Sequence, residues 1–207
     1  MCKLKTDIDN IAKPATSLIL IGVLKGYVKN PIGFLIKTKL TFNKYKKRIQ
    51  LELPMDFIDS TGLIAWIYIR LCDRIGKEKA FEVIRACVLT SGLAVQQANF
   101  RNVETQRTFE NLKKFQQRAN KEGSTKLNTV EIIEESENRY EFRVTRCLFY
   151  ELFTYLKVPE LTSVMCSIDN AIFNTYLPEK LIFHRNGINK TLLNGHEFCE
   201  FVIEKKI

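Results

Sequence analysis

Residues 130–146 read VEIIEESENRYEFRVTR, and the second half of this segment alternates strictly between apolar and polar side chains. The apolar positions are Tyr140, Phe142 and Val144. A period of two is typical of a strand with one covered face. An apolar run precedes a Ser-Glu-Asn turn at 136–138. The segment therefore predicts a β-hairpin.

Elements that follow this hairpin indicate the fold class. Alternation returns at 180–186 and at 197–204, which predicts two more strands. Residues 147–157 and 160–176 have helical patterns, separated at Pro159. Because the strands come in adjacent pairs, we expect an α+β fold with one antiparallel sheet.

The first half of the chain is predominantly helical in its pattern. Residues 61–75 are apolar on most faces, and 77–92 repeats the helical period up to Gly92, where we expect the helix to end. A third, more polar helix is expected at 103–120, on the surface or against a partner. An alternating Ile-Leu-Leu pattern at 49–53 indicates a short strand. We expect a single domain over 1–207, with a mainly helical part at 1–122 and the sheet and helix pair at 126–207.

The composition is that of an ordinary soluble globular protein, with 45% hydrophobic and 27% charged residues. Charged residues precede the first apolar run, which predicts no signal peptide, a cytoplasmic location and reduced thiols for the six cysteines. Cys72 and Cys87 lie in apolar helical patterns and are expected in the core. The apolar stretch Leu18 to Phe34 is broken by lysines and Pro31, so we expect a core or groove-lining helix and no membrane partner.

The formal net charge of +9 permits nucleic-acid binding without requiring it. The densest basic run, at 44–48, is one short cluster and not the extended stripe of a nucleic-acid surface, so we expect a solvated turn and no nucleic-acid partner. A basic protein also attracts an anionic small substrate. Whether the chain forms a homo-oligomer is left open.

Reactive side chains gather after the hairpin. Cys147 follows a strand and opens a helix, a position at which the pKa of a thiol is typically lowered. Tyr150 and Glu151 follow at i+3 and i+4, on the same helix face. A thiol, a phenol and a carboxylate on one face can serve nucleophilic or acid–base chemistry. The alternative is a buried cysteine beside two solvent-facing residues.

Two further cysteines add to this group. Cys166 and Asp169 lie at i and i+3 of the next helix, and Cys199 lies in the last strand. Together with Glu151, they are ligand types for zinc or iron, although the short chelating loops of structural zinc sites are absent from the sequence. Whether a metal is bound stays open.

Basic residues near the last strands are candidates for anion binding. Arg185 and His184 point to opposite faces of the strand at 180–186, and Arg185 is the one we expect in a site, as a bidentate partner of a carboxylate. His184 stays a weaker candidate. Arg146 precedes Cys147 and is also placed to meet an anion.

Residues 144–203 resemble the L-2-amino-thiazoline-4-carboxylic acid hydrolase family, with a weaker match at 76–90. The shared pattern is a cysteine before an aromatic-Glu helix, Pro-Glu-Leu, Cys-x-x-Asp, a proline before a strand ending in arginine, and Gly-x-x-x-Cys-x-Phe. Its residues are Cys147, Tyr150, Glu151, Cys166, Asp169, Pro178, Arg185, Gly195, Cys199 and Phe201. Leu148 and His196 stand where proline and an acidic residue are common. The closing hairpin also resembles ligand-binding domains of the 4-vinyl-reductase type.

The resemblance implies hydrolysis of a cyclic amidine. In the family's namesake reaction, water adds to the ring carbon of 2-amino-thiazoline-4-carboxylate, and the ring opens to N-carbamoyl-cysteine. From the ligand types above, the expected cofactor is none or a single divalent metal ion. The resemblance implies a small carboxylate-bearing substrate as the partner. The alternative is a non-catalytic, sensor-like domain that binds a small molecule or a metal. The roles expected for a hydrolase are nucleophile for Cys147 or Cys166, base for Asp169 or Glu151, carboxylate clamp for Arg185, and substrate contacts for Tyr150 and Arg146.

Overall fold

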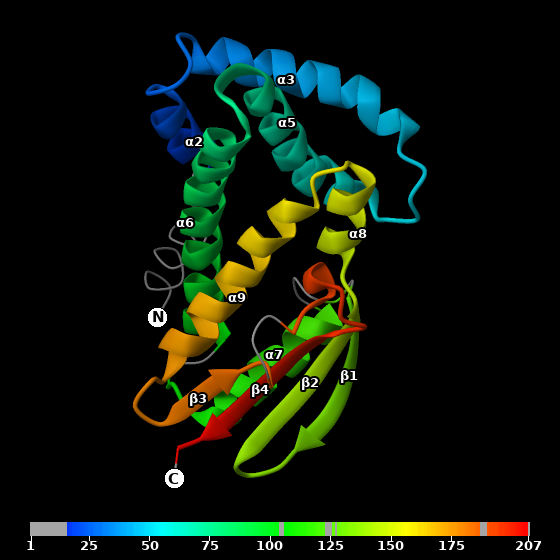
Figure 1. Ribbon diagram of the computed structural model, residues 1–207. Helices are drawn as coiled ribbons and strands as arrows, with labels where there is room; N and C mark the ends of the chain where they lie inside the picture. The colour runs from blue at the N-terminus through cyan, green and yellow to red at the C-terminus, as the bar shows by residue number, and fades with distance from the viewer. Residues whose placement is uncertain (1–15, 104–105, 123–125, 127, 187–189, 207) are drawn as a thin grey trace.

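The computed structural model describes residues 16–103, 106–122, 126, 128–186 and 190–206 (Figure 1). The expectation about a signal peptide lies outside these residues. The α-helices are α2 (Thr16–Leu24), α3 (Pro31–Tyr45), α4 (Met55–Phe57), α5 (Leu63–Ile75), α6 (Lys77–Val103), α7 (Phe109–Glu122), α8 (Leu148–Tyr155) and α9 (Thr162–Tyr176). Single turns are η1 (Lys46–Arg48), η2 (Ile58–Gly62), η3 (Pro159–Leu161) and η4 (Leu192–Asn194). The strands are β1 (Thr129–Glu135), β2 (Arg139–Arg146), β3 (Leu181–His184) and β4 (Cys199–Lys205).

These four strands form one antiparallel sheet in the order β1-β2-β4-β3 (Figure 1). The hairpin predicted at 130–146 is β1 and β2, and the two later strands add beside β2. Phe142 of β2 lies opposite Phe201 of β4, and their rings stack with centroids 4.6 Å apart. The α+β fold with an antiparallel sheet is confirmed.

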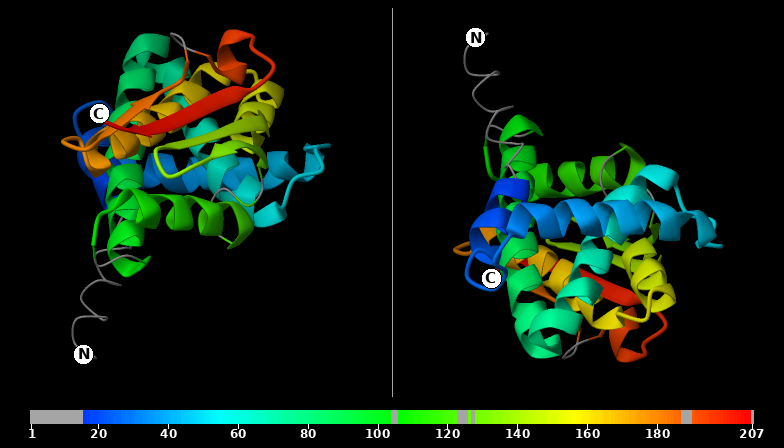
Figure 2. Two further views of the ribbon diagram at one scale, coloured as in Figure 1. Left: turned by 90° about the horizontal axis from the view of Figure 1, so that it is seen from below. Right: turned by 90° about the horizontal axis from the view of Figure 1, so that it is seen from above.

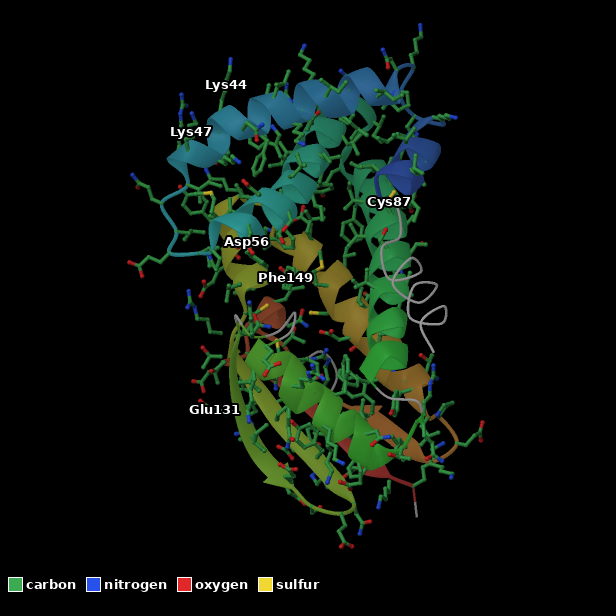
Figure 3. The ribbon with its side chains drawn as sticks, turned by 180° about the vertical axis from the view of Figure 1, so that it is seen from behind. Lys44, Lys47, Asp56, Cys87, Glu131 and Phe149 are labelled. Carbon is green, nitrogen blue, oxygen red and sulfur yellow. The ribbon has the colours of Figure 1, made fainter. Side chains whose placement is uncertain are left out.

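One face of the sheet is apolar and covered by helices. Tyr140, Phe142 and Val144 are buried on this face and oppose apolar residues of β4. Helix α9 covers part of it, because Phe173 packs edge-on against Phe201 with ring centroids 5.9 Å apart. Helix α7 lies against the same sheet, behind it in Figure 1 and in front of it in Figure 3.

Helix α7 is the polar helix expected at 103–120, and it begins later, at Phe109. Its thin apolar stripe, which includes Leu112 and Phe115, is buried in the main core. Lys205 of β4 places its ammonium group 5.5 Å from the centre of the Phe109 ring. The partner of this helix is therefore the chain's own sheet.

The helix expected to end at Gly92 runs on to Val103, so the predicted end was wrong. The glycine serves close packing instead of chain termination. A Cβ atom at Gly92 would lie 2.3 Å from Cδ1 and 3.0 Å from Cγ1 of Ile168 in α9. Glycine therefore lets α6 and α9 approach each other at the level of Ile168.

The strand expected at 49–53 is also wrong, because these residues form an irregular connection between η1 and α4. Ile49, Leu51 and Leu53 are half-buried and pack against the core. Their alternation reflects this one-sided burial, and none of them pairs with a strand of the sheet described here. The apolar stretch at 18–34 is divided between α2 and α3. No helix within the described ranges is both long enough and apolar enough to cross a bilayer.

Candidate active site

A cavity of about 130 Å³ lies where the start of α8, helix α9 and the apolar face of the sheet meet. Its wall brings together Cys147, Cys166, Asp169, Arg185 and Cys199. Phe149, which also lines it, lies between the helical part and the sheet in Figure 3. The remaining wall residues are Asn128, Val144, Thr162, Met165, Ile168 and Phe201.

Local structure explains this convergence. Cys147 is the N-cap of α8, directly after β2, so it stands at the end of the sheet. Cys199 begins β4 and pairs with Val144, which places it on the covered face beside the cavity. Cys166 and Asp169 are about one turn apart on α9. Three elements that are distant in sequence thus deliver three thiols and a carboxylate to one wall.

The thiols are not activated in the way expected for a helix N-terminus. Burial raises the pKa of Cys147 to about 11, although backbone N–H groups of the first turn of α8 act in the opposite direction. Burial, together with Asp169, raises the pKa of Cys166 to about 12. The expected low pKa of Cys147 was wrong, because removal of the thiolate from water outweighs the helix end. The resting site holds neutral thiols.

Cys199 is held differently from the other two thiols. Its Sγ accepts a hydrogen bond of 3.3 Å from the backbone N–H of Leu192, the first residue of η4. Burial raises the pKa of Cys199. Because its sulfur is fixed against the loop, Cys199 supports the wall of the cavity.

Asp169 is the carboxylate of the cavity. Burial raises its pKa to about 6, against the attraction of the nearby Arg185 cation. Burial and the Arg185 cation are the two influences on this pKa, and no hydrogen bond to the carboxylate from a residue that the structure describes contributes to it. A carboxylate with this pKa is ionised at neutral pH and accepts a proton far more readily than an ordinary aspartate.

Arg185 lies in the wall just beyond β3 and is buried. Nε and Nη2 each donate to Oδ1 of Asn170 at 3.1 Å, and Nη1 donates to the carbonyl of Glu200 at 3.3 Å. The guanidinium carbon stands 4.1 Å from the centre of the Phe201 ring. The cation is thus positioned by neutral acceptors, so its charge is available to an anion in the cavity.

A second, larger hollow of about 480 Å³ adjoins the first. Cys166 and Arg185 belong to the walls of both. Polar side chains of α9, among them Ser167 and Asn174, face residues near η4 across it. The larger hollow is open and polar, whereas the smaller cavity is mostly apolar. The larger hollow therefore forms an approach from solvent to the smaller cavity.

The other sequence candidates lie away from the cavity wall. Arg146 donates two hydrogen bonds, of 2.7 and 3.0 Å, to the carboxylate of Glu151. This pair forms at the surface because opposite charges meet between the end of β2 and the first turn of α8. Tyr150 is half-buried outside the wall. The structure therefore leaves Asp169, and not Glu151, as the carboxylate that faces the thiols.

His184 and Gly195 also have other places in the structure. His184 lines the larger hollow, and its Nε2 lies 2.9 Å from the carboxylate of Glu204. Gly195 ends η4 with φ of 83°, a left-handed conformation that glycine adopts without strain. Its role is to turn the chain toward β4, and so to place Cys199.

The described ranges offer no ready set of ligands for a metal ion. No three His, Cys, Asp or Glu side chains there are arranged so that they could hold a metal ion.

Two polar wall residues were missed by reasoning from the sequence. Asn128 accepts a hydrogen bond of 3.2 Å from the backbone N–H of Leu148, so it caps α8 from a loop. Thr162 opens α9, and its buried hydroxyl has no hydrogen-bond partner among the described residues. Neither lies in a pattern of spacing that distinguishes it from an ordinary loop or capping residue.

Residues 57–203 match the family model described as L-2-amino-thiazoline-4-carboxylic acid hydrolase. The matched range contains the whole wall of the cavity, whereas α2 and α3 lie outside it. No curated protein and no solved structure shows a significant match to the chain.

Proposed function

The chain belongs to the L-2-amino-thiazoline-4-carboxylic acid hydrolase family, and from this membership and the geometry of the cavity we propose that it opens a cyclic amidine such as 2-amino-thiazoline-4-carboxylate by hydrolysis. The observation that carries the proposal is the meeting of Asp169, Arg185 and two accessible thiols around one cavity of about 130 Å³. These groups supply a base, an anion-binding cation and nucleophiles within the space of a small heterocycle.

Arg185 binds the substrate carboxylate in this mechanism. The guanidinium is held by Asn170 and by the Glu200 carbonyl, so binding requires little reorganisation. Its remaining N–H donors match the two oxygens of a carboxylate. The substrate ring then lies among apolar wall residues such as Phe149 and Met165.

Asp169 and Cys147 carry the chemistry in the proposal. Cys147 is the nucleophile we assign, because N–H groups of Phe149 and Tyr150 favour its thiolate form. Asp169 accepts the thiol proton as the sulfur adds to the ring carbon, and returns it to the ring sulfur when the carbon–sulfur bond breaks. Water then hydrolyses the adduct, which releases Cys147 and the carbamoyl product.

The experiment is incubation of the purified full chain with 2-amino-thiazoline-4-carboxylate, with the N-carbamoyl product measured by mass spectrometry. Turnover that is lost in the Asp169→Asn protein and kept in the Cys87→Ser protein supports the proposal. Cys87 is buried in the core on α6, away from the cavity. If the protein turns over neither this compound nor related cyclic amidines but binds them saturably, the hydrolase proposal is wrong and the domain is a binding module.

A binding module is the second candidate, and the neutral thiols favour it. An apolar cavity with one buried cation and thiols of raised pKa can hold an anionic ligand without transforming it. In that case Arg185→Lys would weaken ligand binding, whereas Asp169→Asn would change binding little and have no reaction to affect.

Replacement of Arg185 by lysine is expected to raise KM about tenfold or more, with a much smaller change in kcat. Lysine keeps the charge but cannot donate in the bidentate fork. A contact made equally in the ground state and the transition state appears mainly in KM. Steady-state kinetics with a substrate analogue that lacks the carboxylate is the control, because the substitution should leave its KM unchanged. An equal KM effect on both compounds would contradict the carboxylate contact.

The pH dependence should report Asp169. A general base works only when ionised, so kcat/KM should fall as the pH drops through the pKa of about 6. An unperturbed aspartate would keep its activity down to about pH 4. A profile of kcat/KM against pH measures the pKa of this acidic fall in activity, and only pH values at which the protein stays folded are used. An acidic limb near pH 4 would assign the base to another carboxylate.

A further inference from the structure

The first part of the described chain has an unusual charge distribution. Residues 16–51 contain eight Lys and Arg and no Asp or Glu. This segment carries +8 of the formal net charge of +9, so the rest of the chain is nearly neutral. It lies before the range matched by the hydrolase family. The positive charge is therefore concentrated on one part of the molecule, outside the part that builds the cavity.

Helix α3 presents an apolar stripe in the middle of this charge. Ile32, Ile36 and Leu40 are 57%, 57% and 60% exposed, and their spacing of four residues places them along one side of the helix. Phe34 and Phe42 are buried on the opposite side, against the body of the protein. Seen from above, α3 lies across the molecule in front of the other helices (Figure 2). The stripe therefore faces outward.

Lysines border the stripe on both sides. Helical geometry places Lys39 on one flank, and Lys37 and Lys44 on the other. All three are exposed, and within the described ranges none of them forms an ion pair. Lys44 and Lys47 point away from the body of the molecule in Figure 3. An apolar stripe between lysines is the arrangement of a helix that lies in a membrane interface.

A small cavity beside α3 adds a place for an anionic group. It has a volume of about 70 Å³, and Lys37 of α3 lines it together with Arg70 and Arg74 of α5. Asp73 also lines it and lies 3.5 Å from Arg70, which leaves an excess of positive charge. The cavity therefore lies beside the helix that carries the stripe.

We propose that the outer face of α3 docks onto anionic phospholipid membranes, with Ile32, Ile36 and Leu40 in the interface and the flanking lysines on lipid phosphates. The proposed contact lies in the plane of the interface, and it replaces the expectation from the sequence that the chain has no membrane partner. No helix within the described ranges could span a bilayer. Charge complementarity selects this occupant. Two copies meeting through α3 would bring lysines together, and a nucleic acid would make no use of the aliphatic stripe. The proposal is independent of the proposed hydrolase activity.

Cosedimentation of the full chain with vesicles tests the proposal. Binding is expected to mixed vesicles of phosphatidylcholine and phosphatidylglycerol, and not to vesicles of phosphatidylcholine alone. Binding should fall steeply when salt is raised from about 0.1 M to about 1 M, because the Debye screening length falls from about 10 Å to about 3 Å. Replacement of Lys37, Lys39 and Lys44 by glutamine should lower the partition constant on the order of a hundredfold.

Two matched variants complete the test. Ile36→Ser with Leu40→Ser should lower the partition constant about tenfold or more. Ile132→Ser with Ile133→Ser, on the exposed edge strand β1, should leave it unchanged, because these isoleucines lie far from α3. Equal binding of all variants to anionic vesicles would overturn the proposal. So would a dimer, seen by light scattering, that the α3 substitutions dissociate while vesicle binding is absent, or capture of an acidic protein or RNA without binding to vesicles.

Discussion

Asp169→Asn is expected to lower kcat for ring opening by about 100- to 10,000-fold, the range typical of a general acid–base group. The amide keeps the shape of the side chain and cannot accept the proton of the attacking thiol. The expected loss in kcat is much larger than the change in KM, because the substrate carboxylate is bound by Arg185. Steady-state kinetics on 2-amino-thiazoline-4-carboxylate measures both constants.

The stability of the Asp169→Asn protein separates a chemical effect from unfolding. The folded state raises the pKa of Asp169 to about 6, so ionisation at neutral pH opposes folding. This penalty appears as the pH rises from the ordinary aspartate pKa through about 6. The amide variant should therefore melt at or above the temperature of the parent at pH 7. Asp73→Asn, at an exposed position of α5, is the matched control and should keep full activity. Full activity in the Asp169→Asn protein would show that the carboxylate has a structural role.

The sheet was predictable because its signal is local. Tyr140, Phe142 and Val144 alternate with charged residues, and the covered face of a strand imposes this alternation. The same signal misled at 49–53, where half-buried residues alternate without any strand partner. Alternation reports one-sided burial, and a sheet also requires a neighbouring strand, which the sequence of one segment does not reveal.

Gly92 shows a related limit. A glycine near the end of a helical pattern usually marks the C-terminus. Here it makes room for Ile168 of α9, a residue 76 positions later in the chain. The meaning of a glycine depends on which helix crosses it, and that contact is set by the tertiary fold.

The composition of the candidate site was partly predictable. The spacing of Cys166 and Asp169 on one helix face is a local property, and the structure places both on the cavity wall. The spacing of four residues between Cys147 and Glu151 suggested the same for α8, but Arg146 draws the Glu151 carboxylate to the surface. The pKa of Cys147 was misjudged because burial, which comes from packing against the sheet, outweighs the helix end.

Cys147→Ser is expected to lower kcat/KM about a hundredfold or more if its sulfur attacks the ring carbon. A hydroxyl is a far weaker nucleophile than a thiolate, and in this apolar wall Asp169 cannot ionise it as readily. An adduct of substrate mass on Cys147 should accumulate in the parent protein when the reaction is quenched with acid, and intact-mass spectrometry followed by peptide mapping detects it. The serine variant should show no such adduct.

The other pocket cysteines distinguish attack by Cys147 from a general need for thiols. Cys199→Ser should lower kcat/KM less than about tenfold. The Cys199 sulfur already accepts a hydrogen bond from the Leu192 N–H, so its role is to support the wall of the cavity. Cys166→Ser tests the remaining thiol, whose pKa of about 12 makes it the harder one to ionise. If Cys147→Ser retains activity and Cys166→Ser loses it, the nucleophile is on α9. If both serine variants retain activity while Asp169→Asn does not, neither thiol attacks the ring carbon. Asp169 then acts as the general base that activates a water molecule for this attack.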